Sequence, residues 1–243
     1  MTNPQSLTSK DLETIRLHFF KIYEKCSNQF EKGNGSYLFD GYTYQYLQEN
    51  YSKQELLFNK VIGKNNILEI GTYMGHSLLI MLIANPKLNI TTIDINEKFS
   101  RPATNYLKSQ FPEANIDFIH NDSLNAIKSL NKKFDFFHID GCHKNKIITK
   151  EFNYCKKLNL SNNLEIIFDD DIVCKNLVTN IESTYNIKQK ISKGTGLATN
   201  LYLNIELPNS KFKKKLLDSI FYAKNIYKYI SFKFKKLMNL KKI

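Results

Sequence analysis

The pattern of hydrophobic residues changes twice along the chain and divides it into three parts. Near the N-terminus they recur every three or four positions, which predicts a helix over residues 8–31 and an aromatic-rich helix over 42–61. Short apolar runs then alternate with helical stretches, and a lysine-rich helical pattern ends the chain. We expect a helical extension or substrate cap at 1–60, a main domain at 61–208 and a helical tail at 209–243.

The main domain has the pattern of a parallel sheet. Its expected strands are Ile67–Ile70, Ile90–Ile93, Ile116–Ile119, Phe134–Ile139 and Ile166–Phe168, with two more at about 187–191 and 198–205. Helices are expected between them at 76–84, 97–110, 122–130, 144–157 and 173–185. Short apolar strands separated by helices indicate a sheet covered on both faces. The expected fold class is therefore α/β, a Rossmann-like sheet of seven mainly parallel strands.

Charge is concentrated in the tail. The net charge is +12, but residues 211–243 hold eleven lysines and a single acid, Asp218. Only Arg16 and Arg101 are arginines, whereas phosphate- and base-reading surfaces commonly use arginine forks. A nucleic-acid partner is therefore disfavoured.

The tail also carries an apolar stripe. Its members step by four and three residues: Leu216, Ile220, Ala223, Tyr227, Ile230, Phe234 and Leu237. A basic amphipathic helix suits peripheral contact with an anionic membrane surface. Packing on its own domain and self-association between subunits are the alternatives.

Other features bear on localisation. No apolar run approaches the ~20 residues of a membrane-spanning helix. The polar start has no signal-peptide core, and the four cysteines form no CxxC motif. We expect a cytoplasmic protein with reduced thiols, whose tail could bring it into peripheral contact with the membrane.

A glycine-containing turn follows the first expected strand, in the run Ile67-Leu68-Glu69-Ile70-Gly71-Thr72-Tyr73-Met74-Gly75-His76-Ser77. Glycines at 71 and 75 allow a tight turn and close approach of a ligand to a helix N-terminus. The GxxxG spacing differs from the dinucleotide motif GxGxxG. Asp94, at the end of the second strand, suits a ribose diol. An ordinary strand–helix turn is the alternative interpretation.

Carboxylates gather at two other strand ends, as Asp140 after the fourth strand and Asp169-Asp170-Asp171 after the fifth. The carboxyl ends of parallel strands meet at one edge, so these residues should converge there. Close carboxylates repel one another unless a cation lies among them, and their hard oxygens suit Mg²⁺ or another divalent ion. The alternative is that the acidic run simply begins a helix.

These segments resemble motifs of class I S-adenosylmethionine (SAM)-dependent methyltransferases, in the order ILEIGTYMGHSLLIM, TTIDIN and HNDS. The resemblance covers about residues 37–180 and is strongest to catechol O-methyltransferase-like and sugar or macrolide O-methyltransferases. It implies SAM as cofactor and a Mg²⁺ triad of Asp140, Asp169 and Asp170, with Asp171 leaving the register of the acidic pair open. The cofactor-binding residues it implies are Glu69, Gly71, Thr72, Gly75, Ser77, Asp94, Asp122 and Ser123. Asp122 is also a candidate helix N-cap.

His143 stands where the catechol-type enzymes have a lysine base. It could remove a proton from a substrate hydroxyl, with Asp140 as the second catalytic residue, or it could be a solvent-facing residue at a helix start. His138, inside a strand, is expected in the core or behind the site. His76 and His120 lie near the crevice without an assigned role.

The expected reaction is metal-assisted transfer of a methyl group to a hydroxyl of a diol-containing small molecule or glycan. The aromatic segment Tyr37–Tyr51 would stack on a sugar, or belong to the core. The alternatives are a related transferase or hydroxylase, a non-methylating protein with the same fold, and a nucleic-acid methyltransferase. The amino-methylating signature (N/D)PP(Y/F) is absent, because the fourth strand ends in IDGCH.

Overall fold

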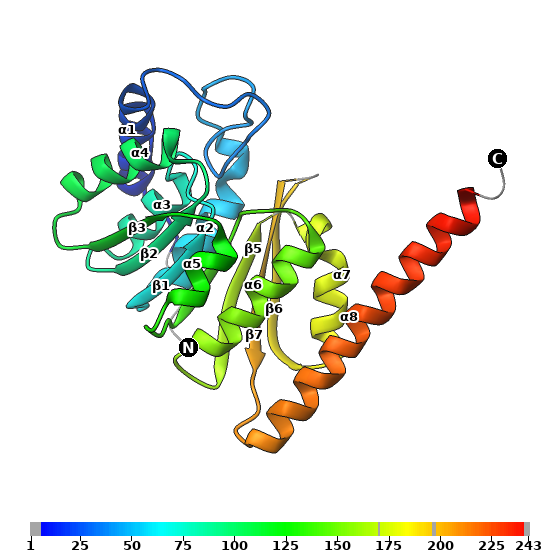
Figure 1. Ribbon diagram of the computed structural model, residues 1–243. Helices are drawn as coiled ribbons and strands as arrows, with labels where there is room; N and C mark the ends of the chain where they lie inside the picture. The colour runs from blue at the N-terminus through cyan, green and yellow to red at the C-terminus, as the bar shows by residue number, and fades with distance from the viewer. Residues whose placement is uncertain (1–5, 170, 196–197, 241–243) are drawn as a thin grey trace.

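The computed structural model describes residues 6–169, 171–195 and 198–240, which contain a seven-stranded sheet with helices on both faces (Figure 1). The strands are β1 (Asn66–Ile70), β2 (Asn89–Asp94), β3 (Asn115–His120), β4 (Phe136–Ile139), β5 (Asn163–Asp169), β6 (Asn186–Thr195) and β7 (Ala198–Glu206). Their order is β3-β2-β1-β4-β5-β7-β6. Strands β1 to β5 pair in parallel, whereas β7 is antiparallel to both of its neighbours. The expected α/β sheet is confirmed.

The helices of the main domain lie where the sequence predicts them. They are α3 (His76–Ala84), α4 (Glu97–Gln110), α5 (Ser123–Ser129), α6 (Asn145–Leu158) and α7 (Asp171–Glu182). Outside the main domain, α1 (Ser9–Lys25), the 3-10 helix η1 (Gln48–Asn50) and α2 (Tyr51–Val61) precede the sheet, and α8 (Lys211–Leu240) follows it.

The two N-terminal helices are shorter than expected. Helix α1 ends at Lys25 because Ser27 and Asn28 take left-handed backbone conformations, with φ of 59° and 54°. Residues 42–47 are not helical, so the prediction of a helix over all of 42–61 is wrong there. The Asp40 carboxylate accepts the N–H groups of Tyr42 and Thr43 and forms a turn instead.

Alternate strand residues face opposite helix layers. Ile67 and Phe136 pack in one buried cluster with α1 to α4, whereas Leu68 and Phe137 pack in another with α5 to α8. Both faces are covered, which explains why the strands read as nearly continuous apolar runs.

Four polar residues follow the same alternation onto the α1–α4 face, and they lie at the edge where the parallel strands end. Glu69 of β1 is opposite His138 of β4, and Asp169 of β5 is opposite Asn200 of β7. All four are buried. This polar layer lies at the carboxyl ends of β1, β4 and β5.

The N-terminal segment supplies part of the core over this face. Tyr37, Leu38 and Phe39 are buried, and the ring of Tyr44 stacks on Phe19 with centroids 4.2 Å apart. Most of the aromatic side chains between Tyr37 and Tyr51 therefore pack inward, and Tyr42, 63% exposed, is the exception with a largely open ring. In the described part of the chain, no helix has the length and hydropathy needed to cross a membrane.

Candidate active site

The turn after β1 is closely packed against the end of β4. Gly71 has a φ of 89°, and a Cβ there would lie 2.0 Å from the carbonyl oxygen of Asp140. Gly75 has a φ of 67° and is the N-cap of α3. Gly71 is therefore required by the neighbouring strand end, whether or not a ligand approaches the turn.

Asp94 holds this turn in place. Its Oδ2 accepts the backbone N–H groups of Thr72 and Tyr73 at 3.0 and 2.7 Å, and its Oδ1 accepts the N–H of Asn96 at 2.8 Å. The side chain is only half-buried, and a carboxylate has about four lone-pair sites. Asp94 thus joins the β1 and β2 turns and retains acceptor capacity toward a ribose.

Glu69 is completely buried beneath the turn, with a hydrogen bond to each oxygen. Ser77 donates to Oε1 at 2.6 Å and Thr92 donates to Oε2 at 2.5 Å. The hydroxyl of Thr72 contacts that of Thr92 at 2.5 Å. Glu69, Ser77 and Thr72 therefore form one internal network, in which the Ser77 and Thr72 hydroxyls bond within the protein.

A buried lysine neutralises Asp169. Lys53 of α2 places its Nζ 2.9 Å from Asp169 Oδ1, and the two side chains are 2% and 8% exposed. The approach lies outside hydrogen-bonding angles, so the contact is an ion pair. Sequence reasoning required a cation among these carboxylates, and in the structure this ammonium group lies beside one of them.

Asp140 and His143 lie together at the end of β4, with 4.0 Å between Asp140 Oδ1 and His143 Nε2. Their side chains are 26% and 45% exposed, so both are accessible to a ligand. Asp170, the third predicted metal ligand, lies outside the described residues. Among the residues that the structure does describe, no three His, Cys, Asp or Glu side chains come together as a metal site.

A second buried chain of polar groups links the N-terminal segment to Glu69. The Tyr37 hydroxyl is 2.8 Å from His138 Nε2 and accepts a hydrogen bond from the Asn200 amide. Burial, followed by the charges of Asp169 and Asp140, raises the pKa of Tyr37 well above its ordinary value. The other ring nitrogen, His138 Nδ1, lies 3.4 Å from Glu69 Oε1.

Comparison with known proteins agrees with this geometry. A family model described as a methyltransferase domain matches residues 68–170, from β1 to the end of β5. An Arabidopsis thaliana protein, provisionally named a caffeoyl-CoA O-methyltransferase, is 36% identical over 72 residues. That match spans 29% of this chain and 31% of the relative, so it is confined to part of each protein.

Solved structures match over a longer range. The O-methyltransferase TomG of Streptomyces achromogenes, in complex with SAM, has a TM-score of 0.59 at 15% identity, covering 86% of this chain and 100% of that one. An O-methyltransferase of Bacillus cereus bound to S-adenosylhomocysteine has a TM-score of 0.59 at 15% identity, covering 78% and 91%. At such identities the likeness shows the fold, and the family model adds the domain type. Residues 68–170 thus match a methyltransferase domain, and the sheet that contains them has the fold of these methyltransferases.

Two more predicted residues of the methyltransferase domain lie at the start of α5. Asp122 caps this helix by accepting the N–H groups of Leu124 and Asn125, which confirms its N-cap role. Ser123 donates at 2.5 Å to Glu151 Oε1 of α6, a residue that sequence analysis did not single out. Burial raises the pKa of Glu151 to about 6, although the hydrogen bond from Ser123 lowers this pKa. Adenine contacts by Asp122 and Ser123 stay a prediction.

The other histidines of the domain have structural partners. His76 is buried, with its Nδ1 2.7 Å from the Ser36 hydroxyl and its Nε2 3.0 Å from that of Tyr44. Burial lowers its pKa to about 3, so the ring is neutral and joins the N-terminal segment to α3. His138 is fully buried, as expected.

Sequence reasoning missed Lys53 and Asn200, and it missed the polar contacts of Tyr37, which together complete the polar layer of the methyltransferase domain. Asn200 carried a usable signal, because it shares the alternation of Tyr202 on the α1–α4 face of β7. Lys53 and Tyr37 come from the segment before the sheet, whose path over that face no local pattern reveals.

Proposed function

We propose that the protein is an O-methyltransferase that moves the methyl group of SAM to a hydroxyl of a small molecule or glycan. The observation that carries the proposal is the proximity of two features at one sheet edge. The Asp94-held turn suits the cofactor, and the accessible Asp140–His143 pair follows the adjacent strand β4. The O-methyltransferase names of the matched proteins support the same type of acceptor atom.

In this reaction the cofactor supplies an electrophilic methyl group, and the protein has to orient and deprotonate the hydroxyl. His143 Nε2 takes the hydroxyl proton as the oxygen bonds to the methyl carbon and the carbon–sulfur bond breaks. Asp140, 4.0 Å from that nitrogen, stabilises the imidazolium that forms. The products are the methyl ether, S-adenosylhomocysteine and a proton that His143 passes to water.

The metal-assisted form of this reaction is a separate expectation. The described residues do not fit a divalent-ion triad, because Asp169 already pairs with the Lys53 ammonium. We therefore route no step through a metal ion. The expectation of a diol acceptor depended on chelation by a metal ion. The expectation of a sugar acceptor depended on exposed tyrosine rings between Tyr37 and Tyr51, but most of these rings pack inward.

The acceptor is tested by a screen for methyl transfer from labelled SAM. The panel contains simple phenols, catechols, glycans and nucleic acid, each with wild type and with His143→Ala. The proposal expects label on an oxygen of a phenol, catechol or sugar, and a large loss with the variant. Label on a base nitrogen of nucleic acid would overturn it.

A further inference from the structure

Helix α8 contacts the domain through one of its faces. Phe221 on that face is 1% exposed and packs in the α5–α8 cluster. Asp218, one turn earlier, lies 2.5 Å from the ammonium of Lys156 and accepts a hydrogen bond from Tyr185 at 3.0 Å. The first half of α8 is thus anchored, while its C-terminal half extends beyond the domain (Figure 1).

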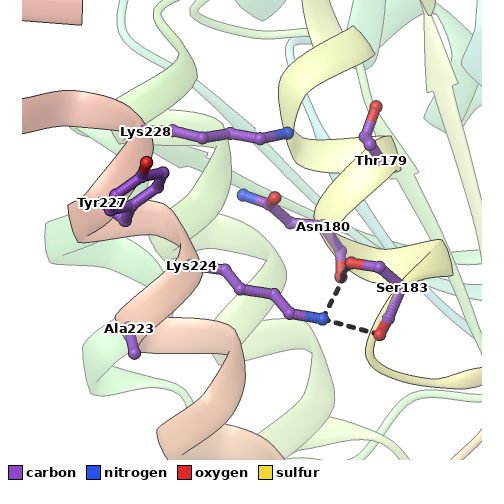
Figure 2. A pocket seen from close by; sticks show the side chains of 7 residues that line it. All are labelled: Thr179, Asn180, Ser183, Ala223, Lys224, Tyr227 and Lys228. Atoms are coloured by element: carbon purple, nitrogen blue, oxygen red, sulfur yellow. Dashed lines mark hydrogen bonds between the residues drawn. The ribbon is translucent and has the colours of Figure 1, made fainter. Parts of the chain in front are cut away.

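Two lysines extend the anchored face. Figure 2 shows Lys224 and Lys228 reaching from α8 toward α7. Lys224 donates to the carbonyl and hydroxyl of Ser183 at 2.7 and 3.0 Å, and Lys228 to the carbonyl of Asn176 at 3.5 Å. Lys224 thus interacts with a carbonyl directly after the C-terminal end of α7, a favourable arrangement for the helix dipole, whereas Asn176 lies in the middle of that helix.

Most of the apolar stripe lies outside the anchored face, although Ala223 and Tyr227 also line a pocket between α8 and α7 (Figure 2). Its described large members are exposed: Leu216 by 48%, Ile220 by 36%, Tyr227 by 75% and Ile230 by 58%. Phe212, one turn earlier on the same side, is 77% exposed. Packing on its own domain, one of the three expected roles of the tail, therefore leaves most of the stripe exposed over residues 212–230.

Charge decides between the two remaining partners, a second copy of the helix and a lipid surface. Asp218, the one acid in residues 211–243, is already engaged with Lys156. Two such helices facing each other would bring lysines together without carboxylates to pair with them. Anionic lipid headgroups supply the missing negative charge, and the exposed lysines Lys213 and Lys215 can reach them beside the stripe.

We propose that the outward face of α8 binds an anionic lipid surface, with Phe212, Leu216, Ile220, Tyr227 and Ile230 entering the headgroup region. The anchored face keeps the domain attached while the stripe is immersed. Apolar burial and lysine–lipid attraction act together in such helices. This property is independent of the acceptor of the methyl group.

The test is co-flotation of the full chain with vesicles of phosphatidylcholine alone or with added phosphatidylserine. The wild type should float with the phosphatidylserine vesicles, and added salt should weaken the binding. The variant Leu216→Ser/Ile220→Ser/Ile230→Ser should lower the bound fraction about tenfold or more. A matched control, Leu17→Ser/Leu160→Ser, changes side chains that are 58% and 59% exposed elsewhere and should bind like wild type.

Two results would overturn the proposal. Wild type that fails to float, together with a concentration-dependent dimer that the triple variant abolishes, would assign the stripe to a second copy of the chain. Equal flotation of wild type, triple variant and control would show that α8 is not the binding surface. Retention of SAM binding by the triple variant verifies that its domain is folded.

Discussion

Lys53 Nζ lies 2.9 Å from Asp169 Oδ1, and both side chains are almost completely buried at the edge where the parallel strands end. The pair joins α2, which precedes the sheet, to the last residue of β5. The Lys53 ammonium also lies 4.9 Å from the centre of the Tyr37 ring. The Lys53 ammonium thus contacts both the acidic cluster, through Asp169, and the ring of Tyr37 in the buried polar layer.

Breaking this pair should destabilise the fold strongly. Lys53→Met leaves an unpaired buried carboxylate, which costs about 3–5 kcal/mol of unfolding free energy. Lys53→Met/Asp169→Asn should recover much of this loss, because the remaining charge is removed. Urea unfolding near neutral pH measures both. Lys64→Met is the control, since its partner Glu165 is 22% exposed and the expected loss is about 1 kcal/mol. Equal losses of unfolding free energy in Lys53→Met and Lys64→Met would contradict the assignment of Lys53 and Asp169 as a buried ion pair.

Methyl transfer should survive chelation. The Lys53 ammonium neutralises Asp169 without a metal ion, so we expect EDTA to leave turnover with a verified acceptor nearly unchanged. The measurement is the initial rate before and after exhaustive treatment, with and without added Mg²⁺ or Mn²⁺. If chelation abolishes activity and either ion restores it, the result would support the predicted metal site in the acidic cluster, including Asp170.

His143→Ala should lower turnover by about 10²–10⁴-fold at neutral pH, because the variant lacks the proposed proton acceptor. The deficit should shrink at alkaline pH, where the acceptor hydroxyl ionises without help. His120→Ala is a suitable control, since His120 is 41% exposed and bonds to the carbonyl of Ile95. A pH–rate profile of the His143 variant parallel to that of wild type would argue against the role of base.

Much of the fold, but only part of the site, follows from sequence patterns. The short apolar runs and the helical stretches between them predict the sheet, and the turn Glu69–Gly75 with Asp94 lies where expected. Lys53 could not be foreseen, because in a lysine-rich chain its position resembles any solvated residue. Its burial depends on how α2 packs on the sheet. The same long-range packing turns Tyr37 and Tyr44 inward.

Glu151 should make stability depend on pH. Its pKa is about 6 in the folded protein and ordinarily 4.5, so the folded state binds the proton more tightly. The resulting loss of unfolding free energy is absent below about pH 4.5, grows as the pH rises through 6 and is complete above that pH. Glu151→Gln should therefore gain about 1–2 kcal/mol relative to wild type between about pH 5 and pH 8. Urea unfolding at both pH values measures the change, with exposed Glu113→Gln as control. The same pH dependence in wild type and Glu151→Gln would contradict the raised pKa.

Calorimetric titration with SAM tests the central claim most directly, namely that the turn held by Asp94 is the cofactor site. Wild type should bind SAM, and Asp94→Ala should bind it about tenfold or more weakly, because the ribose acceptor and the bonds to the Thr72 and Tyr73 N–H groups are lost. Asp117→Ala, on the adjacent strand and paired with Lys132, should bind like wild type, and thermal unfolding verifies that both variants are folded. Equal affinity of wild type and the folded Asp94 variant, or no binding by wild type, would contradict the account.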